Sequence, residues 1–303
     1  MSTRPFLRVE ALTKLFVPRQ TFLGRLAGRQ GRGVLALDDV SFSIPKGRTY
    51  ALVGESGSGK STAALLVAGL IQRDRGKIEI DGIDLAEADP ATRRALRRRV
   101  QMVFQDPFTS LNPRWRVGAI ISEPLQALGL LSDRQAIAAR VADLLSRVGL
   151  DSADAARFPH EFSGGQRQRI AIARMLAAEA ELVICDEPTS ALDVSVQAQI
   201  LNLMRDLQEE LGLTYLFISH NLAVVRFMAD DIGVLKAGRL VEAGTAEAIF
   251  GDPQHSYTLA LLAAVPEASV EAAVAARQAR SGSGASSMHS RPGLIAGQVA
   301  NEF

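Results

Sequence analysis

A glycine-rich run near the start of the chain contains the residue types that bind phosphate. Its length and order fit the pattern G-x-x-x-x-G-K-[ST]. The run comprises Gly54, Glu55, Ser56, Gly57, Ser58, Gly59, Lys60, Ser61 and Thr62. Glycines let the backbone wrap closely around phosphate oxygens, and free amides at a helix N-terminus point their positive ends at an anion. Lys60 is then placed to reach the β- and γ-phosphates of a nucleotide, and the Ser61 hydroxyl to ligate Mg²⁺. A plain glycine turn is the competing interpretation, but it leaves the lysine and the hydroxyl at this spacing unexplained.

Two acidic residues at the end of an apolar run supply the next group that nucleotide hydrolysis needs. All residues from Leu182 to Cys185 are apolar, and Asp186 and Glu187 follow them directly. Such a run is typical of a parallel strand covered on both faces, and ligands bind at the carboxyl ends of such strands. Asp186 is therefore predicted to organise Mg²⁺, as a Walker-B aspartate does, and Glu187 to hold the attacking water. Cys185 is interpreted as core packing.

A second glycine signal precedes a helical stretch in the middle of the chain. Ser163 is followed by Gly164, Gly165 and Gln166, and residues 167–174 continue as a good helix. Ser163 is a natural N-cap, and the free amides of the two glycines create a further anion site at a helix N-terminus. Taken alone, these four residues are also consistent with a plain capping turn.

The glycine-rich run requires a strand before it and a helix after it, and its neighbours fit this requirement. Residues 50–53 are a short apolar strand, and residues 63–68 begin a helix. Strands and helices alternate through much of the chain, which favours a mostly parallel sheet. Residues 6–16 and 35–44 alternate in polarity and predict an antiparallel flank.

The pattern becomes helical between about residues 106 and 162. One amphipathic face recurs at helical spacing and comprises Ile137, Val141, Leu144, Leu145 and Val148. A later helix has its apolar face at Val196, Ile200, Leu203, Leu207 and Leu211. The predicted fold class is α/β: a P-loop NTPase core with a mostly parallel sheet, an antiparallel β flank and an inserted helical subdomain.

Two arginine-rich segments are interpreted as solvated surfaces. A helix capped by Asp89, with Pro90 at its first position, carries five arginines, and residues 17–34 form a basic loop. A flexible tail is predicted for residues 267–303, where the composition shifts to Ala, Ser and Gly.

The composition excludes several classes of protein. The 303 residues are 47% hydrophobic and carry a formal net charge of only +1, so no charge field argues for nucleic acid as a partner. A single cysteine excludes an internal disulfide and favours a reducing compartment. Neither a signal peptide nor a run of about eighteen apolar residues is present, so we expect that the chain does not cross a membrane by itself.

Together these motifs resemble the ATP-binding cassette (ABC) family over residues 6–266. The glycine-rich run, Gln105, the Ser163–Gln166 signature, Asp186–Glu187, Asp193 and His220 occur in that family's order. The resemblance implies an ATPase that binds ATP and Mg²⁺. It also implies a second cassette chain, because one chain carries one P-loop and one signature. A heterodimer is favoured, with a homodimer as the fallback.

The resemblance also assigns roles to single residues. Gln105 senses the metal and the water, Glu187 is the catalytic base, Asp193 belongs to the D-loop and His220 contacts the γ-phosphate. Phe16 is similar to the aromatic residue that stacks on adenine, although a satisfied core aromatic is the competing interpretation.

Two further segments resemble the ATPase subunits of oligopeptide, dipeptide and nickel importers. They are residues 105–114 and 255–262, the second of which begins His255-Ser256-Tyr257. Residues 1–266 are then the ATPase domain, with an importer-type segment at about 250–266. The tail has no cysteine, so the iron-sulfur cluster of some relatives is not expected.

This resemblance implies a peripheral subunit at the cytoplasmic face of the inner membrane. Its partners are two membrane-spanning permease subunits and an extracytoplasmic solute-binding protein. Peptide is the first expectation for the solute, with nickel or oligosaccharide as alternatives. A soluble, non-transport cassette ATPase is the alternative of a different class.

Overall fold

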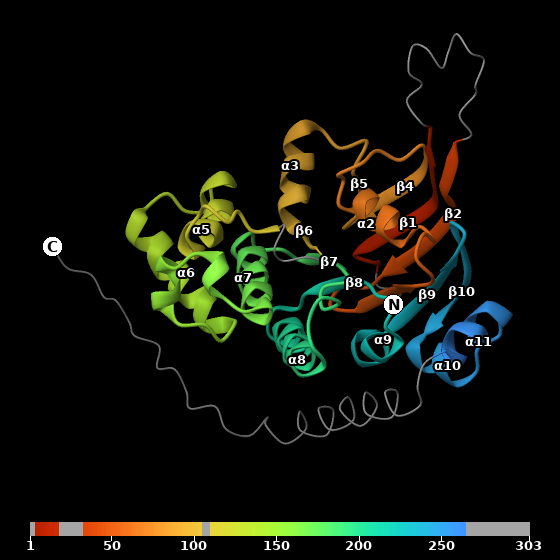
Figure 1. The fold of residues 1–303 in the computed structure, drawn as a ribbon. Coiled ribbons are helices and arrows are strands. Elements are labelled where there is room, and N and C mark those ends of the chain that lie inside the picture. Colours follow the sequence, from red (N-terminus) through yellow and green to blue (C-terminus); the bar gives the residue numbers. More distant parts are fainter. Residues whose placement is uncertain (1–3, 18–32, 105–109, 265–303) are drawn as a thin grey trace, which may run out of the picture.

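The computed structural model describes residues 4–17, 33–104 and 110–264. Two β-sheets lie beside each other, and the helices flank them (Figure 1). The predictions for Gln105, for most of the basic loop and for the tail from residue 267 lie outside the described residues.

The larger sheet has six strands and supplies the platform for the glycine-rich run. Its strands are β10 (Arg239–Thr245), β9 (Asp231–Lys236), β3 (Thr49–Val53), β8 (Thr214–Ile218), β7 (Leu182–Asp186) and β6 (Val100–Val103), in that spatial order. All neighbouring pairs are parallel except the β9–β10 hairpin. The predicted mostly parallel sheet is thus confirmed. The hairpin itself was not predicted.

The smaller sheet is antiparallel, as predicted for the flank. It contains β2 (Val34–Ile44), β1 (Leu7–Phe16), β4 (Arg75–Ile80) and β5 (Ile83–Asp84), in that order. β1 and β2 pair along most of their length, and the first three residues of β2, Val34 to Ala36, lie beside the glycine-rich run.

The helices fall into groups by the face that they cover. The bounds are α2 (Lys60–Val67), α3 (Pro90–Arg99), α5 (Val117–Ala127), α6 (Arg134–Arg147), α7 (Gly164–Ala177), α8 (Val194–Leu211), α9 (Leu222–Met228), α10 (Ala246–Gly251) and α11 (Ser256–Ala263). Two short 3₁₀ turns, η1 (Ser152–Ala156) and η2 (Pro159–Glu161), precede α7. α5 and α6 pack together beside α7, away from the antiparallel sheet (Figure 1). This helical part lies between β6 and β7 in the chain, as the sequence predicts for an insertion.

The predicted apolar face is buried on α6, but on α8 two of its residues, Val196 and Leu203, are only half-buried and one is exposed. The predicted face of α6 is buried along its length. On α8, Ile200 and Leu207 are buried, whereas Leu211 is 44% exposed because it is the last residue of the helix. Within the described ranges, no helix is both long enough and apolar enough to span a bilayer.

Side chains alternate across the large sheet and divide the core in two. Tyr50 and Leu52 of β3 face α2 and the antiparallel sheet, whereas Ala51 and Val53 face the helices on the other side. Because both faces are covered, the central strands read as continuous apolar runs.

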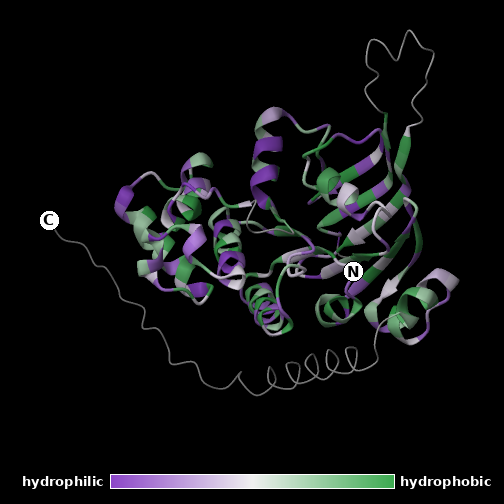
Figure 2. Cartoon of the chain, viewed as in Figure 1, coloured by the Kyte–Doolittle hydropathy of each residue, from purple (hydrophilic) through white to green (hydrophobic). Residues whose placement is uncertain are grey.

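Two arginines of α3 bind other parts of the protein, whereas the sequence predicts that this face of the helix is solvated. Figure 2 shows this helix as mainly hydrophilic. Arg93 donates to the carbonyls of Leu85 and Ala88, and Arg99 binds the carboxylates of Glu181 and Asp81. These bonds attach the helix to the two sheets.

Candidate functional site

The glycine-rich run, the Asp186–Glu187 pair and His220 meet at one end of the large sheet. In the pairing register, Leu52 of β3 lies opposite Ile218 of β8, and Ile218 lies opposite Asp186 of β7. The glycine-rich run leaves β3 two residues after Leu52, and His220 follows β8 by two residues. Parallel pairing therefore brings groups from distant parts of the sequence together at the carboxyl ends of the strands.

The glycine-rich run forms a tight loop that leads into α2. Lys60 Nζ donates to the carbonyls of Gly54 (2.8 Å) and Glu55 (2.7 Å) and lies 3.4 Å from Ser58 Oγ. At Gly59, φ is 110°, and a Cβ there would lie 2.4 Å from the Ala36 carbonyl oxygen. A side chain at that position is therefore excluded by both backbone conformation and space.

Lys60 is a buried cation with the charges of three carboxylates nearby. It is only 6% exposed. Burial lowers its pKa from the ordinary value, and the nearby charges of Glu187, Asp186 and Glu55 partly oppose this shift. A phosphate group would supply this lysine with a further anionic partner.

The Ser61 hydroxyl and the Asp186 carboxylate lie next to each other. Ser61 Oγ donates to Asp186 Oδ1 at 3.2 Å. Burial raises the pKa of Asp186, and the charge of Glu187 adds to this effect, while the Ser61 bond and Lys60 oppose it. Within the described part of the chain, no group of three or more His, Cys, Asp or Glu side chains could hold a metal ion. The pair instead offers two hard oxygen donors, which suits a cation that keeps water and ligand-phosphate oxygens in its shell.

Glu187 and His220 form a contact pair beside these donors. Glu187 Oε1 lies 2.9 Å from His220 Nδ1, and the Glu187 side chain is 18% exposed. The backbone of Glu187 is left-handed, with φ of 49°, and its N–H donates to the Ile218 carbonyl at 2.9 Å. The turn after β7 thus points an oriented carboxylate along the sheet edge. This carboxylate is a candidate proton acceptor for an attacking water.

Lys60, Ser61, Glu187 and His220 line one cavity of about 700 Å³, and Asp186 lies beside it in contact with Ser61. Its lining consists of Val34, Leu35, Ala36, Ser56, Gly57, Gly59, Lys60, Ser61, Thr62, Glu187, His220 and Ala237. This volume falls within the range of small-ligand sites, about 300–1,000 Å³. A phosphate cradle, a cation site and a proton acceptor together suit the hydrolysis of a nucleoside triphosphate.

Four of the lining residues were not predicted from the sequence. Val34, Leu35 and Ala36 begin β2, and Ala237 lies in the turn between β9 and β10. They reach the cavity through contacts between distant strands, and no local motif marks them.

Phe16 lies at the end of β1, next to this cavity. It pairs in register with Val34, and its ring is 43% exposed, with Lys14 Nζ 5.5 Å from the ring centroid. An exposed ring in this position is not a buried core aromatic. The adenine-stacking role stays a prediction.

The Ser163 signature forms a cap at the start of α7. Ser163 Oγ accepts the Gln166 N–H at 3.3 Å, and Gln166 Oε1 accepts the Ser163 N–H at 3.0 Å. Gly165 packs on Val196 of α8, where an added Cβ would lie 2.3 Å from Val196 Cγ1. Among the described residues that line the cavity, none belongs to this signature.

Asp193 caps the neighbouring helix α8. Its Oδ1 accepts the Val196 N–H at 2.9 Å and the Ser195 hydroxyl at 2.7 Å. These two bonds, the backbone one first, lower the pKa of Asp193. The signature and Asp193 thus lie together at the starts of two packed helices, outside the cavity lining.

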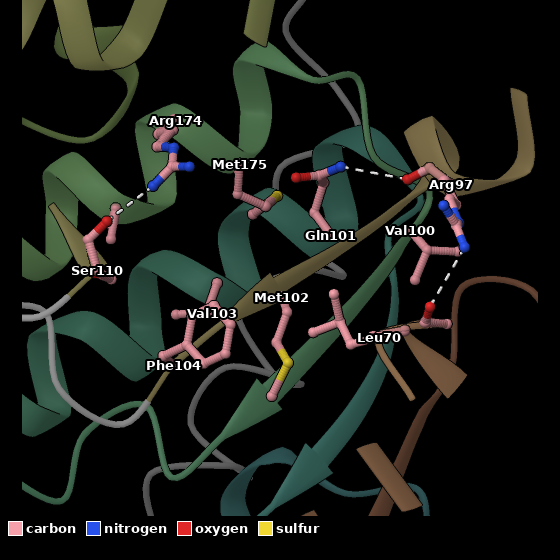
Figure 3. Close-up of a pocket in the computed structure, with 13 residues that line it drawn as sticks. Leu70, Arg97, Val100, Gln101, Met102, Val103, Phe104, Ser110, Arg174 and Met175 are labelled. Atoms are coloured by element: carbon pink, nitrogen blue, oxygen red, sulfur yellow. Dashed lines mark hydrogen bonds between the residues drawn. The ribbon is translucent and has the colours of Figure 1, made fainter. Parts of the chain in front are cut away.

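A second cavity, of about 540 Å³, lies between β6, α3 and α7 (Figure 3). Its rim includes Leu70, which is 59% exposed, and Phe104, which is 42% exposed. Arg174 of α7 donates to the Ser110 carbonyl at 2.9 Å, and both residues line one side of the cavity (Figure 3). Phe104 directly precedes Gln105, so this cavity borders the segment predicted to sense the metal and the water.

The sequence was compared with families of known proteins. Residues 37–190 match the family model described as ABC transporter. A putative peptide import ATP-binding protein of Brucella abortus (strain 2308) is 54% identical over 240 residues, which is 78% of this chain and 72% of that protein.

Two longer relatives are similar over a larger part of the chain. The oligopeptide transport ATP-binding protein OppD of Mycobacterium tuberculosis is 49% identical over 262 residues, covering 86% of this chain and 42% of OppD. The glutathione import ATP-binding protein GsiA of Escherichia coli K12 is 49% identical over 264 residues, covering 87% of this chain and 42% of GsiA. The chain therefore spans less than half the length of these two relatives.

Solved structures show the same fold. A dimeric post-hydrolysis structure of the ATP-binding cassette MJ0796, bound to ADP and Pi, superimposes with a TM-score of 0.68 at 28% identity. The superposition covers 79% of this chain and 98% of that one. The structure of cbiO1 from Clostridium perfringens, part of an ABC transporter complex, also gives a TM-score of 0.68 at 28% identity. It covers 82% of this chain and 92% of that chain.

Proposed function

Because the chain belongs to the ABC transporter family, we propose that it is the ATP-hydrolysing subunit of an importer whose cargo is a peptide. The observation that carries this proposal is the 54% identity to a putative peptide import ATP-binding protein, over 72% of that protein's length. Two further relatives are named for oligopeptide transport and glutathione import, and glutathione is itself a small peptide.

Each residue of the site has a separate role in the proposed ATP hydrolysis. The loop amides and Lys60 would bind the phosphates, and Ser61 and Asp186 would hold Mg²⁺. When bound, Mg²⁺ neutralises charge on the phosphate oxygens. Glu187 accepts a proton from water as the water oxygen bonds to the γ-phosphorus and the bond to the β–γ bridging oxygen breaks. His220, in contact with Glu187 at 2.9 Å, keeps that carboxylate oriented, and its place in the cavity lining supports the predicted contact with the γ-phosphate.

A complete site needs a second cassette, packed head to tail. The support is geometric, since the Ser163 signature is absent from the described lining of the cavity around Lys60. The signature amides of one chain then face the γ-phosphate bound by the other. A pair of two different ATPase chains is favoured, and a homodimer is the fallback.

Gly164→Asp tests this arrangement. An added Cβ at Gly164 meets only the flexible end of Leu192, at 3.2 Å, so the fold tolerates it. The new carboxylate would repel the partner's γ-phosphate in a closed, poorly screened site. We expect ATP bound at Lys60 of the same chain to be retained, while hydrolysis at the partner's P-loop stops. Loss of ATP binding to the variant chain itself, with the partner's site still active, would contradict the head-to-tail arrangement.

We further propose that two membrane-spanning permease subunits hold the cassettes at the cytoplasmic face of the inner membrane. The second cavity is the candidate docking site, because exposed Leu70 and Phe104 give it an apolar rim next to residue 105. Leu70→Asp would then reduce co-purification with the permeases without changing ATP binding. Leu211→Asp, on the similarly exposed end of α8, is the matched control.

The choice of cargo is tested in the assembled transporter. The complex, reconstituted with its extracytoplasmic solute-binding protein, should hydrolyse ATP faster when that protein carries peptide. A complex containing Lys60→Ala gives the background rate. Stimulation by nickel or an oligosaccharide instead of peptide would replace the proposed cargo. Failure to assemble with any permease would favour a non-transport cassette ATPase.

A further inference from the structure

The C-terminal part of the described chain lies directly behind the glycine-rich loop. Glu55 N–H, in the loop, donates to Tyr257 Oη of α11 at 3.0 Å. Gly238 N–H, in the turn between β9 and β10, donates to the Ser58 carbonyl at 2.9 Å. Residues 238 and 257 thus contact the loop backbone from outside the cavity, because neither belongs to the cavity lining.

Tyr257 is itself held firmly. Its side chain is 7% exposed and packs in the larger core, and Lys236 Nζ lies 4.6 Å from the ring centroid. Its N–H donates to Nδ1 of His255, the N-cap of α11, at 3.0 Å. Glu242 of β10 in turn accepts the His255 N–H at 3.1 Å. The hydroxyl is therefore presented to the loop from a fixed position.

The hydrogen bond fixes one peptide unit of the loop. The peptide between Gly54 and Glu55 donates through its N–H to Tyr257 and accepts Lys60 Nζ on its carbonyl oxygen at 2.8 Å. The ammonium group of Lys60 has three donors and three partners, Gly54, Glu55 and Ser58, so a bond to a phosphate must replace one of these contacts. Where the contact to Gly54 is replaced, the Tyr257 hydroxyl is the partner that keeps the peptide unit oriented.

We propose that Tyr257 is a positioning residue for nucleotide binding, through which the His255-Ser256-Tyr257 segment sets the shape of the phosphate loop. The residue touches the loop and not the reacting atoms. It acts by keeping the loop in its binding conformation, so that binding does not incur the free-energy cost of ordering it. The inference rests on ATP binding by this loop, and it gives the C-terminal motif a physical role.

The test compares two tyrosine-to-phenylalanine variants of the full chain. Tyr257→Phe removes the hydroxyl and keeps the ring. Tyr215→Phe is the matched control, because the buried Tyr215 hydroxyl donates to the Met204 carbonyl at 2.9 Å, within the core of the larger sheet. The measurements are calorimetric titration with MgATP and MgADP, and amide hydrogen exchange of residues 54–58.

Tyr257→Phe should lower the affinity for both nucleotides alike, by roughly 3- to 10-fold, since the loop loses one hydrogen bond. Exchange of residues 54–58 should speed up in the same variant, and kcat of the assembled complex at saturating ATP should stay within about twofold. Tyr215→Phe should lower stability and leave affinity and loop exchange unchanged.

Three results would overturn the proposal. They are wild-type affinity in Tyr257→Phe, equal losses of affinity in the two variants, and unchanged exchange at residues 54–58. A wild-type chain that bound neither nucleotide would overturn nucleotide binding as well, so the two ideas fail separately.

Discussion

Gly165 is the point at which a single methyl group would disturb the signature helix. A Cβ there would lie 2.3 Å from Val196 Cγ1, far inside an ordinary van der Waals contact. Val196 is β-branched and close to its own helix backbone, so it has little freedom to move. We expect Gly165→Ala to cost about 1–3 kcal/mol of unfolding free energy through overpacking.

Gly164→Ala is the matched control for this change. Its Cβ would meet only the end of the Leu192 side chain, at 3.2 Å. Both substitutions replace a glycine in the first turn of α7, so they share the gain in helix propensity. The difference between their urea unfolding free energies therefore isolates the clash with Val196. We expect Gly164→Ala to stay within about 0.5 kcal/mol of the wild type.

The double variant Gly165→Ala/Val196→Ala completes a thermodynamic cycle. Removing the valine methyl groups makes room for the new Cβ, so the coupling free energy should be favourable by about 1 kcal/mol or more. The ATPase rate of the assembled complex should fall in Gly165→Ala and recover in the double variant, because Ser163 caps α7 and Asp193 caps α8. A Gly165→Ala variant as stable as Gly164→Ala, or a coupling near zero, would refute this reasoning.

Three further outcomes are expected at the nucleotide site. Lys60→Ala should weaken ATP binding by roughly 10- to 100-fold in a direct titration, since charged hydrogen bonds to the phosphates are lost, and unchanged affinity would remove Lys60 from the site. Glu187→Gln should bind ATP normally and hydrolyse it about 10²- to 10⁴-fold more slowly in the complex. His220→Ala should slow hydrolysis less. A normal hydrolysis rate in Glu187→Gln would mean that another residue is the base. Asp186→Asn should raise Tm at pH 7. The raised pKa of Asp186 means that its ionised form destabilises the folded state once the pH rises above the ordinary aspartate pKa, and asparagine carries no such charge. That gain should disappear toward pH 3 in thermal melts, where the wild-type carboxyl is protonated in both states, and a gain independent of pH would contradict the assignment.

The sequence predicts what is encoded in neighbouring residues. The caps at Asp89 and Ser163 and the amphipathic face of α6 depend on residues a few positions apart, and each forms as predicted. The glycine-rich run can also be recognised from the sequence, because its lysine and its hydroxyl lie within the same short stretch.

Contacts between distant residues carry no such local pattern. The approach of Ala36 to Gly59, the β9–β10 hairpin and the Tyr257 bond to Glu55 all depend on strand pairing across the whole chain. The exposed end of α8 at Leu211 was missed for the same reason, since the periodicity of a helix does not say where its neighbour ends.

The strand order of the larger sheet has a consequence for synthesis of the chain. Within the described residues, β3, which carries the glycine-rich loop, pairs with β8 and β9 alone, and these strands follow more than 150 residues later. At about 5–20 residues per second, the ribosome needs on the order of ten to thirty seconds to deliver them. Throughout that interval the apolar strand Thr49–Val53 has neither edge paired, so a nascent cassette holds its phosphate loop without the sheet that shapes it. Nucleotide therefore becomes a ligand only after β8 and β9 have been synthesised, and it cannot guide the earlier steps of folding.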